Sequence, residues 1–125
     1  MISRLGQVML YVENQQVALD FWTEKMGFKK LMDEDLGGGM RVIEIAPTAD
    51  STTTLMLHNK ALIAEMSPEL DLGTPSLMFY SDQLEQFHDE LKAKGVTVGD
   101  LVAMPTGKVF NFADDEGNYF AVSEK

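Results

Sequence analysis

Two histidines are the side chains of this chain whose unperturbed charge changes closest to neutral pH, so they are the first candidates for chemistry. His58 ends a run of β-forming residues, where it could serve as a hydrogen-bond partner or weak base at the wall of a cavity. A strand-end histidine half in solvent is the alternative interpretation. His88 lies among acidic and amide side chains in a predicted helix, where a solvated surface role is favoured over chemistry.

Carboxylates are the second group of candidates. Glu44 is flanked by Ile43 and Ile45 and therefore faces opposite to them on a strand. That pattern leaves two alternatives open, an anionic anchor inside a cleft or a side chain in water. The pair Asp114–Asp115 falls in a predicted turn, where exposure to solvent argues against general acid catalysis.

Several other chemistries lack the residues that they need. The chain has no cysteine, which excludes disulfides, thiolate zinc sites and a cysteine nucleophile. It has neither a Gly-x-Ser-x-Gly turn nor a Gly-x-x-x-x-Gly-Lys pattern. Gly37–Gly39 precedes no helix and is predicted to form a hairpin turn rather than a phosphate site.

Length and composition predict one globular domain over residues 1–125. Acidic residues outnumber basic ones by 20 to 10, and the formal net charge of −10 repels nucleic acid and favours cationic small molecules, although it can also serve solubility alone. The start of the chain shows no secretory signal, and its first apolar run, Val8–Val12, is far too short to span a membrane. The absence of cysteine fits a soluble, cytoplasmic protein.

Apolar periodicity predicts a βαβββ module over residues 5–58. An apolar helix face carries Val17, Ala18, Phe21, Trp22 and Met26, and Gly27 ends the helix. Trp22 is expected in the core because it lies on this face. The predicted strands are Gln7–Val12, Phe28–Met32, Met40–Ile45 and Thr52–His58, with an acidic, glycine-rich turn at Asp33–Gly39.

The same order of elements recurs over residues 75–125, after a connector at residues 59–74. A second helix carries Leu84, Phe87 and Leu91, with Asp82 as the predicted N-cap and Gly95 at its end. The predicted strands of this module are Ser76–Tyr80, Val96–Met104, Lys108–Ala113 and Asn118–Ser123. The fold class is therefore α+β, with the βαβββ order occurring twice.

Period-2 alternation divides four of these strands into two faces. One face is purely aliphatic or aromatic and suits packing beneath a helix. The other mixes methionine, tyrosine and small polar groups, which suits the wall of a ligand cavity. A second core or a subunit interface is the alternative use of that face. The predicted ligand-binding residues are Gln7, Met9, Tyr11, Met56, His58, Ser76, Met78, Tyr80 and Tyr119.

Three motifs in this order resemble the glyoxalase, bleomycin-resistance and extradiol-dioxygenase superfamily, known as vicinal oxygen chelate proteins. They are Val8-x-Leu10-x-Val12, the helix Ala18-x-x-Phe21-Trp22 leading to Met26-Gly27-Phe28, and Asp115-Glu116-Gly117-Asn118 before the last strand. The resemblance covers nearly the whole chain. It implies two βαβββ modules forming a curved mixed sheet with a cleft, and a homodimer for a chain of this length.

The resemblance also implies four metal-ligand positions, one on each of the first, fourth, fifth and eighth strands. They fall at Gln7, Met56, Ser76 and Ala121. A divalent ion needs three or so hard or borderline donors, whereas alanine supplies none and a methionine thioether is soft. The expectation is thus that neither metal nor another cofactor is used. His58, two residues after Met56, keeps open a metal-dependent, glyoxalase-like lyase or dioxygenase with displaced ligands.

The sequence thus favours a non-catalytic binding protein, similar to the metal-free, drug-binding branch of the superfamily. Its ligand would be a planar or amphipathic small molecule, and the acidic composition favours a cationic one. Neither nucleic acid nor membrane is an expected partner. A purely structural dimer with a filled cleft is the third interpretation.

Overall fold

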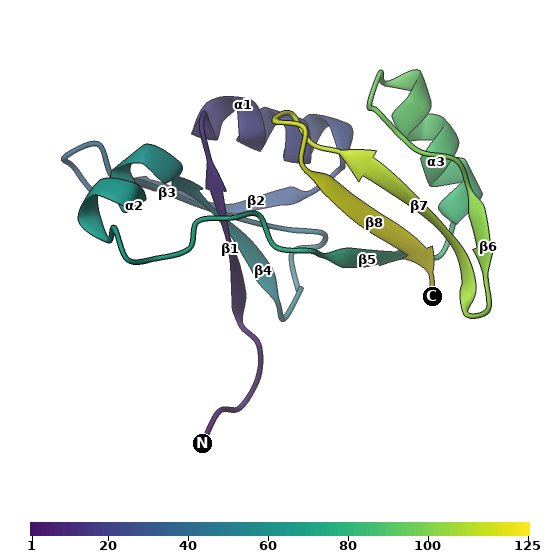
Figure 1. The fold of residues 1–125 in the computed structure, drawn as a ribbon, viewed down its shortest axis with the longest axis horizontal. Helices are drawn as coiled ribbons and strands as arrows, with labels where there is room; N and C mark the ends of the chain where they lie inside the picture. The colour runs from purple at the N-terminus through teal and green to yellow at the C-terminus, as the bar shows by residue number, and fades with distance from the viewer. The chain divides into compact units, whose positions relative to one another are not determined.

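The computed structural model describes residues 1–125 and contains an α+β arrangement in two units, Met1–Thr74 and Pro75–Lys125 (Figure 1). Each unit has its own four-stranded mixed sheet, so the predicted α+β class with two βαβββ modules is confirmed. None of the helices combines the length and the apolar character needed to traverse a lipid bilayer. The first unit contains β1 (Gln7–Val12), α1 (Gln15–Asp20), the π-helical turn η1 (Phe21–Lys25), β2 (Lys29–Asp35), β3 (Arg41–Ala46), β4 (Thr54–Asn59) and α2 (Lys60–Met66). The second contains β5 (Met78–Ser81), α3 (Leu84–Ala93), β6 (Val102–Met104), β7 (Gly107–Ala113) and β8 (Tyr119–Glu124).

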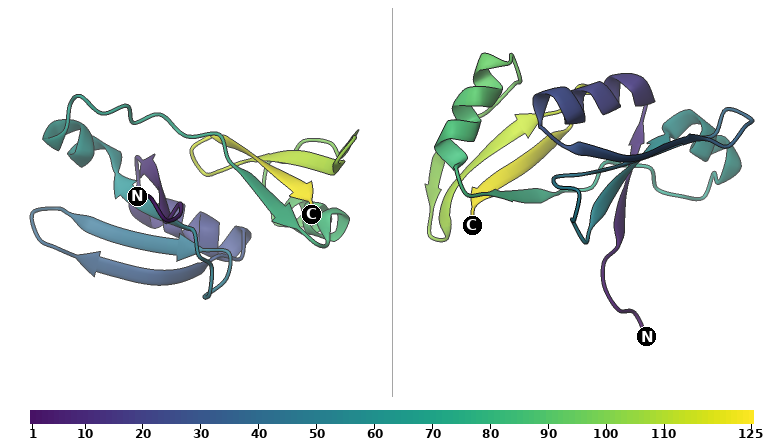
Figure 2. Two further views of the ribbon diagram at one scale, coloured as in Figure 1. Left: turned by 90° about the horizontal axis from the view of Figure 1, so that it is seen from below. Right: turned by 180° about the vertical axis from the view of Figure 1, so that it is seen from behind.

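The first sheet has the strand order β1-β4-β3-β2, in which the first and last strands of the module are parallel neighbours. The other two pairs are antiparallel, and β2 and β3 form a hairpin that Figure 2 shows from two sides. Parallel neighbours need a crossover connection, which α1, η1 and the hairpin supply here. The β1–β4 register places Gln7 beside Thr54, Met9 beside Met56 and Tyr11 beside His58.

The helical segment packs through a narrower face than the sequence predicts. Asn14 caps α1 by accepting a hydrogen bond from the Val17 amide at 3.1 Å. Ala18 and Trp22, one helical turn apart, are fully buried. Val17, which the sequence places on the apolar helix face, is 48% exposed. The buried side of the helical segment is instead formed by Ala18, Leu19 and Trp22, and Val17 lies beside it.

One side chain ties the start of α1 to two strands of the sheet. Gln15 Nε2 donates hydrogen bonds to the carbonyl oxygens of Arg41 at 2.6 Å and Leu57 at 2.9 Å. Arg41 in turn makes a bidentate pair with Asp33, through Nε at 2.9 Å and the terminal nitrogen at 2.8 Å. The charge and hydrogen bonds of Arg41 lower the pKa of Asp33. This network joins helix, central strands and hairpin.

The second sheet has the order β5-β8-β7-β6, again with a parallel pair formed by the first and last strands. Its core contains Phe110, Phe112 and Phe120, all at most 2% exposed, and α3 contributes Leu91. His88 on α3 places Nε2 2.8 Å from the Gly99 carbonyl oxygen, and its ring meets Phe110 edge-on at 4.9 Å. His88 therefore contacts the sheet and is only partly exposed, where the sequence favoured a solvated surface position.

Several boundaries differ from the sequence prediction. The connector at residues 59–74 contains a helix, α2, whose N-cap Asn59 accepts from the Leu62 amide at 3.2 Å. Strand β2 continues to Asp35 through the predicted turn, because Asp33 pairs with Ile43 and binds Arg41. Gln83, not Asp82, occupies the N-cap of α3, and it makes no side-chain capping bond. Of the predicted strand Val96–Met104, only Val102–Met104 is a strand, and Val98 makes an isolated bridge.

Replacing Gln15 with alanine should lower the free energy of unfolding by about 1–3 kcal/mol, because two partly buried carbonyl groups would lose their donor. Gln83→Ala is the matched control, since its side chain makes no capping hydrogen bond. Urea unfolding followed by circular dichroism measures both variants. Equal stability of the two variants would show that the Gln15 bonds contribute nothing net.

Candidate ligand-binding site

The two faces of the first sheet have different surroundings. The face that carries Leu10, Leu55 and Leu57 is buried, with none of these residues more than 5% exposed. The opposite face carries Gln7, Met9 and Tyr11 on β1. Their Cα partners on β4 are Thr54, Met56 and His58. Because paired residues on neighbouring strands point to the same side, these six side chains share one surface.

A hollow of about 810 Å³ lies in the first unit and contains part of this surface. Of the predicted ligand-binding residues, Gln7 and Met9 line it. Its wall combines a carboxylate, a guanidinium and hydroxyls with apolar side chains, which is the mixture that orients small ligands. The lining residues are Arg4, Gly6, Gln7, Met9, Leu31, Glu44, Ser51, Thr52 and Thr54.

Glu44 faces this hollow, which decides between the two alternatives that the sequence left open. Its Oε2 atom accepts hydrogen bonds from Thr54 Oγ1 at 2.7 Å and from Gln7 Nε2 at 3.2 Å. Thr54 is only 7% exposed, so the hydroxyl that donates to this carboxylate belongs to a buried residue of β4. Three strands thus contribute one residue each to a single polar cluster.

His58 forms a second cluster on the same face, with Met9 and Tyr11. Its Nε2 lies 3.2 Å from Met9 Sδ, and its ring stacks on Tyr11 with centroids 5.9 Å apart. The Nδ1 atom is buried and has no hydrogen-bond partner in the protein. Burial lowers the pKa of His58, because desolvation disfavours the imidazolium form. Met56, at 5% exposed, belongs to the core rather than to the wall of the hollow.

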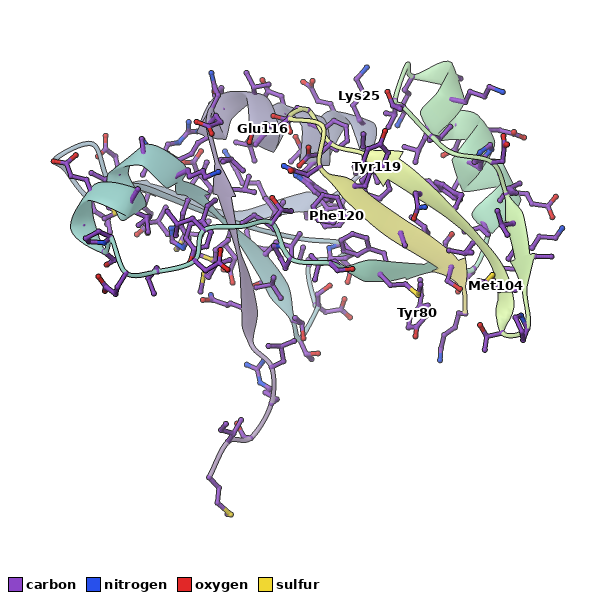
Figure 3. The ribbon with its side chains drawn as sticks, in the orientation of Figure 1. Lys25, Tyr80, Met104, Glu116, Tyr119 and Phe120 are labelled. Atoms are coloured by element: carbon purple, nitrogen blue, oxygen red, sulfur yellow. The ribbon has the colours of Figure 1, made fainter.

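Three of the remaining predicted residues lie on one face of the sheet of the second unit. Met78, Tyr80 and Tyr119 are 56%, 67% and 62% exposed, and Figure 3 labels the two tyrosines. Met78 and Tyr80 line a smaller hollow of about 250 Å³, together with Ser123 and the end of the chain. Lys125 Nζ lies 5.5 Å from the centre of the Tyr80 ring, within the range of a cation–π contact.

Ser76 does not lie on a strand. Strand β5 begins at Met78, and Ser76 is an exposed residue of the segment before it. The parallel pairing with β8 starts at Met78 and Ala121, and the Ala121 amide reaches back only as far as the Leu77 carbonyl at 3.1 Å. The strand thus begins two residues later and ends one residue later than the predicted Ser76–Tyr80.

The four metal-ligand positions implied by the family do not fit a divalent ion. Gln7 uses its amide nitrogen on Glu44, Met56 offers a buried thioether, and Ala121 has no donor atom. Ser76 contributes only a neutral hydroxyl from an irregular segment. No group of three or more His, Cys, Asp or Glu side chains in the described chain is arranged to hold a metal ion.

The acidic turn before β8 has a structural role. Asp114 Oδ1 accepts from the backbone amides of Glu116 and Asn118, both at 2.9 Å, which closes the turn. Much of Asp115 is exposed, but partial desolvation and the adjacent Asp114 charge raise its pKa to about 6. This carboxyl lies in a turn and not in either hollow, so the expectation that it has no general acid role stands as a prediction.

Sequence reasoning missed several residues of the larger hollow. Thr54 shares the period-2 face of Met56 and His58, so extending that pattern by one step would have included it. Arg4, Ser51 and Thr52 lie outside the strands, where no periodicity shows which way a side chain points. Leu31 lies at an irregularity of the β2–β3 pairing, which breaks the alternation of faces.

The fold and this site define a class of protein. A family model described as Glyoxalase/Bleomycin resistance protein/Dioxygenase superfamily matches residues 4–122. The chain belongs to this superfamily, as its motifs indicated.

Individual relatives are similar over their whole length. The chain is 33% identical to the uncharacterized protein YetH of Bacillus subtilis, over 99% of this chain and 100% of YetH. It is 27% identical to TnmS3, an antibiotic binding protein from Streptomyces sp. CB03234, with a TM-score of 0.83 over 98% of this chain and 96% of TnmS3. UcmS2 is 25% identical, with a TM-score of 0.82 over 98% of each chain.

His58 should titrate below its ordinary pKa of 6.5, because its folded environment favours the neutral ring. A lowered histidine pKa means that the unfolded state binds more protons. The part of the folding stability that depends on neutral His58 is therefore fully present above pH 6.5. It is lost as the pH falls from 6.5 towards the lower pKa of the folded state. Urea midpoints of the wild type should fall more steeply than those of His58→Asn between pH 7.5 and 5. Parallel curves, or an NMR titration midpoint above 6.5, would contradict this assignment.

Protein purified without chelators should contain no stoichiometric nickel, zinc or iron, because the four donor positions do not form a divalent site. Inductively coupled plasma mass spectrometry measures this directly. Addition of each ion should leave the melting temperature unchanged. One ion per chain, lost on substitution of Gln7, would restore the displaced-ligand enzyme.

Proposed function

We propose that the protein binds an amphipathic, cationic small molecule in the hollow of its first unit, without chemically transforming it. The observation that carries the proposal is the hollow itself. Its volume of about 810 Å³ falls in the range of drug-sized ligand sites, about 300–1,000 Å³. Its lining contains the apolar side chains of Met9 and Leu31 as well as the carboxylate of Glu44.

Charge supports a cationic ligand. The formal net charge is −10, which raises the local concentration of small cations around the protein. Glu44 supplies a negative group inside the hollow, whereas the guanidinium of Arg4 donates to the carbonyl oxygen of Thr52. A ligand with one cationic and one apolar end matches this distribution.

Two further arguments favour binding over catalysis. The antibiotic binding protein TnmS3 has a similar fold and covers nearly the whole chain, which supports an organic ligand. The family's metal positions lack the donors for Lewis-acid chemistry here, and the ring nitrogen of His58 contacts a thioether rather than a carboxylate that would make it a stronger base. We therefore propose no covalent step.

The exposed face of the second unit supports a homodimer. Met78, Tyr80, Val102, Met104 and Tyr119 are large apolar or aromatic residues that are each about half exposed or more. Exposed apolar patches mark binding or interaction surfaces, and this one could serve either a ligand or a second copy of the chain. We propose that this face pairs two copies of the chain in a homodimer. We also propose a cytoplasmic location, since the chain has no cysteine that could form disulfides in an oxidising compartment.

A panel of aromatic compounds with cationic, neutral and anionic side groups tests the proposed function. Thermal-shift screening followed by calorimetry should find ligands among the cationic members. Leu31→Trp narrows the hollow and should weaken the binding of these ligands at least tenfold, which corresponds to about 1.4 kcal/mol. Leu36→Trp, on an exposed residue outside the hollow, is the matched control and should bind like the wild type. A flat response across the panel contradicts the proposal, as does equal binding by both variants.

A further inference from the structure

We infer that Glu44 selects ligands carrying a protonated amine with at least one N–H bond, over neutral amides and over quaternary ammonium groups. This inference rests on the proposed function and specifies the chemistry that the same hollow recognises. It assigns a specificity-determining role to one carboxylate oxygen, Oε1 of Glu44.

The hydrogen bonds of Glu44 leave one of its oxygens available. Thr54 Oγ1 and Gln7 Nε2 both donate to Oε2, and the structure gives Oε1 no protein donor. The two donors come from the adjacent strands β4 and β1, where Thr54 and Gln7 are paired. They hold the carboxylate in one orientation, so that Oε1 is an acceptor of fixed direction rather than a freely rotating charge.

No protein cation neutralises this carboxylate. Ion pairs join Lys30 to Asp33, Arg41 to Asp33, Lys60 to Glu13 and Lys108 to Glu85, and none of them involves Glu44. Arg4 lines the same hollow but directs its guanidinium to the carbonyl oxygen of Thr52. A cationic ligand can therefore pair with Glu44 without first displacing a lysine or an arginine.

The lining also separates two kinds of cation. Quaternary ammonium groups have no N–H and are recognised mainly by aromatic faces. None of the residues that line the hollow is Phe, Tyr or Trp. An ammonium with an N–H instead makes a short, charge-assisted hydrogen bond to a carboxylate oxygen, which suits Oε1.

Three matched probes test the inference: 1-naphthylmethylamine, its N-acetyl derivative and its N,N,N-trimethylammonium derivative. They share one apolar ring system and differ only in charge and in N–H donors. Calorimetry at pH 7 should show the amine binding at least tenfold more tightly than either of the others. The variant Glu44→Gln should bring the affinities for the amine and the acetamide within about threefold of each other. Glu34→Gln, which removes an exposed carboxylate of β2 outside the hollow, should keep the wild-type preference.

The outcomes separate this inference from the proposed function. Equal binding of the amine and the acetamide by the wild type overturns the role of Glu44 and leaves small-molecule binding in place. Tighter binding of the trimethylammonium probe overturns the N–H requirement. Failure of the amine to bind, while only neutral members of the panel raise the melting temperature, overturns both the inference and the cationic ligand of the proposed function, and leaves small-molecule binding itself in place. No binding by any compound in either experiment defeats both. The wild-type comparison does not depend on the stability of the Glu44→Gln variant.

Discussion

The parallel pairing of β1 with β4 is the constraint from which the site of the first unit follows. Parallel neighbours cannot be joined by a tight turn, so the chain between them must cross one face of the sheet. Here α1 contacts β4, and Leu10 and Leu57 of the sheet are buried, as are Ala18 and Trp22 of the helical segment. The other face receives no helix from this connection. Polar and sulfur-containing side chains can therefore occupy it without the cost of burial against an apolar helix.

The same pairing determines which side chains meet. The register places Gln7 opposite Thr54, and both donate to the carboxylate that β3 brings alongside. Two residues further along, Met9 and His58 meet diagonally across the pair. The face thus divides into a polar end around Glu44 and a thioether–imidazole end around His58. Such a division suits an amphipathic ligand better than a metal ion, whose donors would have to converge on one point.

Much of the fold could be predicted from the sequence because its signals are local. Alternation identified β1, β3, β4 and β8 to within one or two residues, and the positive-φ glycines Gly27 and Gly95 end the helical segments as predicted. Element ends were less predictable. Asp33 continues β2 because it pairs with Arg41, eight residues away, and no local pattern contains that bond. The helix α2 was missed inside a segment interpreted as a connector.

For the site, the sequence by itself determined residue types and strand faces. It established the absence of cysteine, the excess of carboxylates, and the grouping of Gln7 and Met9 on a polar face, because alternation along a strand is a property of the backbone. Only the tertiary structure decided that Glu44 turns towards a hollow and that Met56 belongs to the core. Those outcomes depend on which strands lie side by side and in what register. Both are set by contacts between residues distant in the chain, where local periodicity carries no information.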